Sequence, residues 1–295
     1  MTKTEKLSIE ERFLLYKGIL FNNQKFDNEI NIPIKYHFDC PEYKELLEKY
    51  EFEKIAGKGS SFTRAKRLLH YLAPKLKHSS WYDNHIECNS LKLLEYSLNN
   101  DNQGINCLNK AKIFEECCLA LGIYARRVSI LPFSPYDFDN HVVNEIYDEK
   151  LNKWIMLDLT SDGLFVDINK KPLSLLEMRE KFANDEFITF VSSTSKLSDL
   201  NKLKQKNSEE NTYICKNLFY FIIGTDCKFG VSKDYLFFVP VGYSVKKNRI
   251  VNIKYRINHI LDEHKEFIPN LNERLKNAEN FIEPKKADIN IMLNF

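Results

Sequence analysis

The sequence predicts an α+β protein, because helical spacing and strand alternation occupy different parts of the chain. Before residue 122, several segments repeat apolar residues at the spacing of one helix face. Between residues 124 and 167, apolar and polar residues alternate, which indicates an antiparallel sheet. Runs rich in aromatic and branched residues return after residue 212.

Residues 1–58 are expected to form a helical N-terminal extension. Ser8 and Glu11 have the spacing of a capping box, in which each side chain bonds a free backbone N–H at a helix start. A second helix is expected to open after Pro41, since proline is favoured at the first helical position.

Two amphipathic helices are expected next, over FTRAKRLLHYL (62–72) and SLKLLEYSL (90–98). Pro74 would stop the first, because proline lacks the N–H that a helix interior needs. Ser174 and Glu177 repeat the capping-box spacing and predict a short helix further along.

Cys107 stands at the predicted start of another helix. Apolar residues follow it at helical spacing as far as Leu121, and Gly122 is a suitable C-cap. Gly104 and the Asn-rich stretch before it would end the preceding element, so Cys107 should lie at or next to the first helical position. The unpaired N–H groups and the macrodipole at a helix start favour a thiolate, which is the nucleophilic form of cysteine.

Two alternating runs follow, HVVNEIY (141–147) and WIMLD (154–158), and a short polar link joins them. They are expected to pair as an antiparallel hairpin. Some registers of this hairpin place His141 opposite or diagonal to Asp158 on the same side, whereas a shift by one residue would separate them.

A thiol, an imidazole and a carboxylate in this order point to a catalytic triad. The carboxylate would fix the imidazole tautomer, and the imidazole would activate the thiol. Each residue type also has a structural role: free cysteine is a common small core residue, and aspartate often forms the turn at a strand end. The conjunction of Cys107, His141 and Asp158 favours the triad.

The segment from residue 104 to about residue 182 resembles the core of the transglutaminase-like superfamily. That family's pattern is a nucleophilic cysteine opening a helix, a G-I-x-A-R-x-V strand, a histidine starting the next strand, and W-x-x-x-D ending the one after. The matching residues are Cys107, GIYARRV (122–128), His141 and WIMLD (154–158). Relatives usually have proline after the aspartate, where this chain has Leu159, and this difference bears on the local turn.

The resemblance implies a papain-like fold, in which the Cys107 helix packs on an antiparallel sheet carrying His141 and Asp158. Similar bacterial domains suggest that the transglutaminase-like core covers residues 59–191. The implied activity is acyl transfer, or hydrolysis of an amide or peptide, through a thioester on Cys107. Water as acceptor gives a protease or amidase, and an amine gives a transglutaminase. The alternative is a catalytically silent binding or interaction module, although such modules usually lose at least one triad residue.

Two residues are candidates for the oxyanion hole, which needs donors aimed at the developing negative oxygen. Gln103 lies four residues before Cys107 and could supply an amide N–H, and Trp81 could supply an indole N–H. Solvation of a loop is the alternative role for Gln103, and core packing is the alternative for Trp81.

The cysteine content and the net charge limit which cofactors, partners and cellular compartment are expected. Seven cysteines without a signal-peptide pattern favour free thiols in the cytoplasm over a disulfide framework. No Cys-x-x-Cys pair or histidine cluster occurs, so no metal and no other cofactor is expected. A net charge of +2 argues against nucleic acid as a partner, and the apolar runs are too short to span a membrane. The expected partner is a protein or peptide substrate.

Residues 192–212 are polar and predict an exposed linker. Residues 213–295 are expected to form a small strand-rich region, with strands over TYICKNLFYFIIG (212–224), DYLFFVPVGY (234–243) and RIVNIKYRI (249–257) and a helix near the end. This region could recognise substrate, or it could serve packing or oligomerisation, in which case the chain would be chiefly an interaction protein.

Overall fold

A five-stranded antiparallel sheet forms the centre of the protein. The computed structural model describes residues 7–99, 103–192 and 200–294, without the side chains of 200–207 and 262–264. The strand order is β4-β3-β2-β7-β9. The bounds are β2 Ala125–Leu131, β3 His141–Asp148, β4 Lys153–Leu157, β7 Tyr220–Gly224 and β9 Tyr235–Phe238. Mixed helix and sheet content, as the α+β prediction requires, is confirmed.

Two small sheets lie beside the central one. β1 (Lys35–Tyr36) pairs in parallel with β8 (Asp226–Cys227), and β5 (Gly163–Asp167) pairs antiparallel with β6 (Ile188–Ser192). The first of these pairs ties the N-terminal extension to the C-terminal region.

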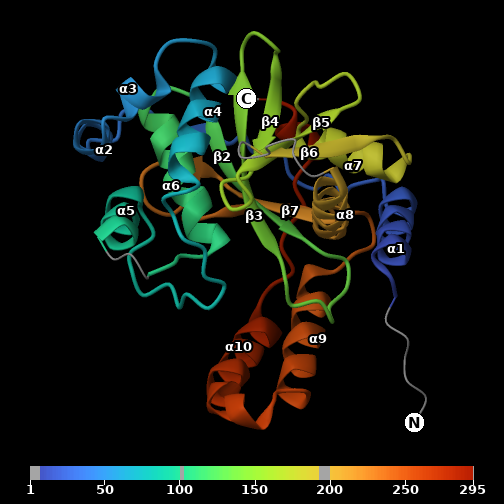
Figure 1. Ribbon diagram of the computed structural model, residues 1–295. Helices are drawn as coiled ribbons and strands as arrows, with labels where there is room; N and C mark the ends of the chain where they lie inside the picture. The colour runs from blue at the N-terminus through green and yellow to red at the C-terminus, as the bar shows by residue number, and fades with distance from the viewer. Residues whose placement is uncertain (1–6, 100–102, 193–199, 295) are drawn as a thin grey trace.

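Helices flank the central sheet on both sides, and a helical hairpin projects from one end of it (Figure 1). The α-helices are α1 Ile9–Asn22, α2 Glu42–Tyr50, α3 Phe52–Ala56, α4 Ser61–Leu72, α5 Ser90–Asn99, α6 Cys107–Ala120, α7 Leu175–Ala183, α8 Leu200–Asn217, α9 Val245–Asn258 and α10 Ile268–Asn280. Two 3₁₀ helices, η1 Asp262–Phe267 and η2 Ile289–Met292, follow α9 and precede the C-terminus. Both predicted capping boxes are present, at the starts of α1 and α7.

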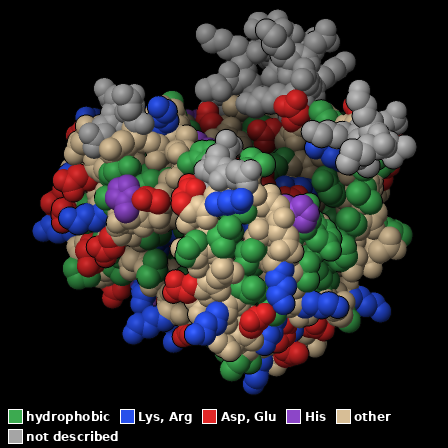
Figure 2. All heavy atoms as spheres, turned by 90° about the horizontal axis from the view of Figure 1, so that it is seen from below, with side chains coloured by type: hydrophobic (Ala, Val, Ile, Leu, Met, Phe, Trp, Pro, Cys, Tyr) green, Lys and Arg blue, Asp and Glu red, His purple; other side chains and the backbone are tan. Residues whose placement is uncertain are grey.

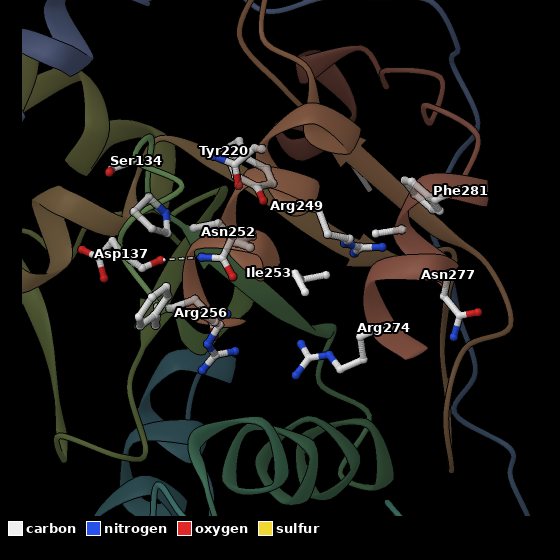
Figure 3. Close-up of a pocket in the computed structure, with 16 residues that line it drawn as sticks. Ser134, Asp137, Tyr220, Arg249, Asn252, Ile253, Arg256, Arg274, Asn277 and Phe281 are labelled. Atoms are coloured by element: carbon white, nitrogen blue, oxygen red, sulfur yellow. Dashed lines mark hydrogen bonds between the residues drawn. The ribbon is translucent and has the colours of Figure 1, made fainter. Parts of the chain in front are cut away.

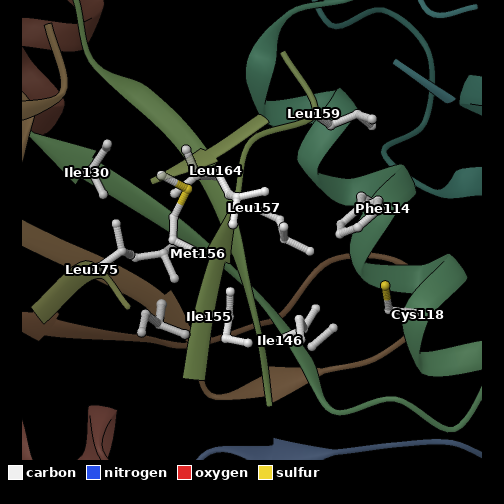
Figure 4. Packing of buried hydrophobic residues seen from close by; sticks show 14 of the residues in the cluster. Phe114, Cys118, Ile130, Ile146, Ile155, Met156, Leu157, Leu159, Leu164 and Leu175 are labelled. Atoms are coloured by element: carbon white, nitrogen blue, oxygen red, sulfur yellow. The ribbon is translucent and has the colours of Figure 1, made fainter. Parts of the chain in front are cut away.

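Helix α6 packs against β2 and β3 and fixes where Cys107 lies. Phe114 and Cys118 face the sheet and meet its apolar residues in the largest buried cluster (Figure 4). The Asn144 side-chain amide on β3 donates to the Ala111 carbonyl at 2.9 Å and joins the same two elements. The helix begins at Cys107, as the sequence predicted.

The β3–β4 hairpin has one of the registers that bring His141 and Asp158 to the same side. Glu145 pairs with Met156 and Asn144 with Leu157. Continuing this register by one step puts Asp158 beside Val143, diagonal to His141. The turn after β4 then closes through mutual backbone hydrogen bonds of Asp158 and Gly163.

The exposed linker expected at 192–212 is wrong over its second half, because α8 spans Leu200–Asn217. Residues 193–199 lie outside the described residues. The helix buries Thr212, Ile214 and Cys215 near its end. A few buried residues in one turn are enough to dock a largely polar helix, and the overall polarity of the segment concealed them.

Of the three strands expected in the C-terminal region 213–295, two are present in part, as β7 and β9, and the third is wrong. Strand β7 pairs with β2 and extends the central sheet, and β9 pairs with β7. RIVNIKYRI, expected as a strand, lies within α9 because its isoleucines fall at helical spacing. Ile253 is buried against Leu271 and Ala278 of α10, and this packing stabilises the hairpin.

No helix among the described residues combines the length and the apolar character needed to cross a membrane.

Candidate active site

His141 and Asp158 form a buried hydrogen-bonded pair at the end of the β3–β4 hairpin. Nε2 of His141 lies 2.7 Å from Oδ2 of Asp158. The exposed fractions of the two residues are 3% and 1%, so water hardly competes for this contact. The pair occupies the position that the hairpin register gives it.

The second carboxylate oxygen of Asp158 is held by the turn that follows β4. Backbone N–H groups of Thr160 and Ser161 donate to Oδ1 at 2.8 and 3.2 Å. Burial by itself would raise the pKa of Asp158, but the charge of His141 and these hydrogen bonds outweigh burial and lower it. Asp158 is therefore kept ionised and fixed in orientation.

The pKa of His141 is raised to about 10. Burial opposes this shift, but the negative charge of Asp158, its hydrogen bond and the neighbouring Cys107 thiol together favour the imidazolium. Because Asp158 occupies Nε2, the ring presents Nδ1 as its remaining nitrogen. The imidazole is thus hydrogen-bonded to a carboxylate and lines the same cleft as the Cys107 thiol.

Cys107 is the first residue of α6 and lines an open cleft. Asn106 is the N-cap, and its side chain accepts from the Asn109 N–H. The cleft has a volume of about 1160 Å³, and both Cys107 and His141 line it. Of the seven cysteines, Cys117, Cys118, Cys215 and Cys227 are buried, while Cys40, Cys88 and Cys107 are partly exposed. Cys107 is the cysteine that reaches the cleft.

The two oxyanion candidates lie in different places. Trp81 lines the cleft and is 87% exposed, which excludes core packing as its role. Gln103 is exposed and is not among the residues that line the cleft. The structure therefore brings Trp81, but not Gln103, to the cavity that contains Cys107.

A cluster of three asparagines at the start of α6 was not predicted. The Asn84 side-chain oxygen accepts from the amides of Asn106 and Asn109 at 3.0 and 2.7 Å. Asn84 and Asn106 line the cleft, and Asn84 adopts a left-handed backbone conformation with φ of 61°. The N-cap preference for asparagine was a signal for Asn106, whereas nothing in the sequence placed Asn84 next to it.

Lys110 is a second feature that sequence reasoning missed. It lies one turn after Cys107 on α6 and is 2% exposed. Burial lowers its pKa, while the charges of Asp158, Cys107 and Asp162 act in the opposite direction. A lysine is therefore buried close to the triad candidates.

Other elements complete the walls of the cleft. Phe138 and Asp139 come from the loop between β2 and β3. Tyr213 on α8 packs its ring 5.5 Å from that of His141. Glu209 and Glu210, also on α8, line the cleft as well. Within the described residues, no group of three or more His, Cys, Asp or Glu side chains could hold a metal ion.

Residues 48–159 match the family model described as the transglutaminase-like superfamily. Among solved structures, the chain is similar to a candidate cysteine protease from Cytophaga hutchinsonii, with 15% identity, a TM-score of 0.33, and coverage of 53% of this chain and 50% of that one. It is also similar to the Rad4/XPC nucleotide excision repair complex, with 14% identity, a TM-score of 0.30, and coverage of 95% and 63%.

A third similar structure is Rad4–Rad23 bound to a 6-4 photoproduct lesion, with 13% identity, a TM-score of 0.28, and coverage of 93% and 60%. The chain thus spans 50% to 63% of the length of these three solved chains. Because the TM-scores of these three structures are low, the family match remains limited to residues 48–159. No curated protein matches the chain significantly.

Proposed function

Residues 48–159 belong to the transglutaminase-like superfamily, and from this premise we propose that the chain is a thiol enzyme acting on amides through a Cys107–His141–Asp158 triad. The observation that carries the proposal is the buried 2.7 Å contact between His141 and Asp158, beside the cleft that Cys107 lines. A carboxylate that is fixed behind an imidazole is what a thiol nucleophile requires.

In the first half-reaction, the Cys107 sulfur attacks the carbonyl carbon of the substrate amide. A C–S bond forms and the C–N bond breaks, while the His141 imidazolium gives its proton to the departing nitrogen. The products of this step are a thioester on Cys107 and a free amine. Asp158 stays ionised throughout and holds the imidazole in place.

In the second half-reaction, an acceptor attacks the thioester. The now neutral His141 takes a proton from water or from an amine, the C–S bond breaks, and the thiolate is restored. Water releases a carboxylic acid, and an amine gives a new amide. The open cleft admits either acceptor, so the acceptor is left as an outcome of the experiment.

The test combines thiol labelling with turnover. At neutral pH, a short pulse of iodoacetamide should alkylate Cys107 at least about tenfold faster than Cys40 or Cys88, which are also partly exposed. Cys107→Ala should remove both this labelling and the release of amine from a peptide-amide library. Cys40→Ala and Cys88→Ala are the matched controls and should retain both.

Adding a primary amine distinguishes the two reactions, because its incorporation into product reports transamidation. Equal alkylation of the three partly exposed cysteines would overturn the triad assignment. Selective labelling of Cys107 without turnover would instead favour the catalytically silent module.

A further inference from the structure

Two arginines of the α9–α10 hairpin face the cleft of the candidate active site. Arg256 on α9 and Arg274 on α10 line both the cleft that contains Cys107 and an adjoining cavity of about 440 Å³. Figure 3 shows their guanidinium groups extending from the two helices into the same region. The hairpin therefore brings two positive charges to one end of the cleft.

The two arginines lack an acidic partner within the part of the chain that the structure describes. Burial lowers the pKa of Arg256, and the positive charge of Arg274 lowers it further. The nearby carboxylates of Asp137 and Asp139 are engaged by Lys216 at 3.0 and 3.7 Å. Two like charges held together without a counter-ion favour the binding of an anion.

The position of Arg256 is fixed by its surroundings. Its guanidinium lies 4.7 Å from the centre of the Phe138 ring, in the loop that forms a wall of the cleft. Asn252, one turn earlier on α9, donates to the carbonyls of Pro135 and Asp137 in the same loop, and the second of these bonds is drawn in Figure 3. These contacts dock α9 onto the cleft wall, so the arginine is held in place before a ligand arrives.

The charges of the cleft walls limit the kind of anion that fits. Glu209 and Glu210 of α8 line the same cleft and would repel a polyanion such as a nucleic acid. The face of the molecule that Figure 2 shows also mixes positive and negative side chains. A guanidinium matches a carboxylate with two parallel hydrogen bonds, so a single carboxylate on an otherwise neutral or mixed-charge peptide fits best.

We propose that Arg256 and Arg274 form a subsite that binds a carboxylate of the peptide substrate while its scissile amide lies at Cys107. The proposal rests on the proposed function for the identity of Cys107 as nucleophile. The carboxylate belongs either to an acidic side chain or to the C-terminus of the peptide. These two sources share the same recognition chemistry.

The experiment measures peptide binding in the Cys107→Ala background, which leaves the cleft intact and stops turnover. Dye-labelled hexapeptide libraries are prepared in matched sets, with one Glu or one Gln and with a free or amidated C-terminus, and affinity is measured by fluorescence anisotropy. Peptides with the recognised carboxylate should bind at least about tenfold more tightly at low salt, and added salt should reduce the difference. A loss on Glu→Gln identifies a side-chain carboxylate, and a loss on amidation identifies the C-terminal one.

Adding Arg256→Gln and Arg274→Gln together should abolish the preference. Lys254→Gln is the matched control, since Lys254 is on the same helix but lines neither cavity, and it should retain the preference. Equal affinities for all peptide sets, or no detectable binding of any peptide, would overturn the subsite. A preference that survives the double substitution, or one that disappears with Lys254→Gln, would overturn it as well. A retained preference without turnover by the unaltered chain would overturn the proposed function alone.

Discussion

Asp158 contacts His141 through Nε2, and this contact leaves Nδ1 as the ring nitrogen that the carboxylate does not engage. The orientation of the imidazole is thereby set by one hydrogen bond from the turn after β4. Asp158 is itself held by two backbone N–H groups of that turn. The chemistry proposed for Cys107 therefore depends on the geometry of a turn to which Cys107 does not belong.

The His141–Asp158 pair should make stability fall at alkaline pH. The folded-state pKa of His141 is about 10, above the ordinary value of 6.5, so the imidazolium stabilises the fold fully below pH 6.5. This contribution should be lost as pH rises from 6.5 to about 10. Other groups titrate in this range, so the quantity to measure is the difference in free energy of unfolding between the unaltered protein and His141→Gln, from denaturant titrations at several pH values. A difference that stays constant over this window would contradict the assignment.

Lys110→Met should raise the free energy of unfolding at neutral pH. Burial lowers the folded-state pKa of Lys110, so its charged form is less favourable in the folded protein than in the unfolded chain. Methionine has a similar length and no charge.

The same change should slow alkylation of Cys107 by iodoacetamide, because it removes a positive charge close to the thiol. Lys110→Arg keeps the charge and serves as the control for the labelling rate. Unchanged labelling of the Met variant would show that Lys110 has no influence on the thiol.

Cys118→Ser should destabilise the fold by about 1–3 kcal/mol, because it buries a hydroxyl against the sheet without a partner. Cys118 is 0% exposed and packs beside Phe114 in the core (Figure 4). Thermal or denaturant unfolding measures the loss, and the folded fraction should still label at Cys107. Cys118→Ala removes the polar group and is the comparison that separates the hydroxyl from the loss of volume. Loss of labelling in folded Cys118→Ser would mean that the wrong cysteine was chosen as nucleophile.

The parts of the site that could be predicted from sequence are those encoded locally. The helix start at Cys107 follows from the glycine and asparagines before it, and the β3–β4 hairpin follows from alternation and a short link. The failures have two physical origins. In α9, the content of strand-favouring residues suggested a strand, although the isoleucines recur at helical spacing. In α8, the overall polarity of the segment hid the one turn that is buried.

Contacts between distant segments carry no local signal at all. Asn84 meets Asn106 across a loop, and Arg256 approaches Arg274 only because α9 and α10 pack as a hairpin. Such pairs depend on tertiary packing, which a single sequence does not display. The Arg256–Arg274 subsite could not have been predicted from a segment that was expected to be a strand.

The contribution of Asp158 to turnover can be isolated with a double-mutant cycle. Asp158→Asn keeps the size of the side chain and its place in the turn but removes the charge that holds the imidazolium, so the rate should fall by about 10²- to 10⁴-fold. His141→Ala should cost at least as much, because it removes the proton carrier itself. The double variant should be little slower than His141→Ala alone, since an orienting carboxylate has no effect once the imidazole is gone. The measurement is amine release under single-turnover conditions, with circular dichroism to confirm that each variant is folded. Fully additive losses would show that Asp158 acts independently of His141, as a turn-forming residue, and the triad would then have to be abandoned.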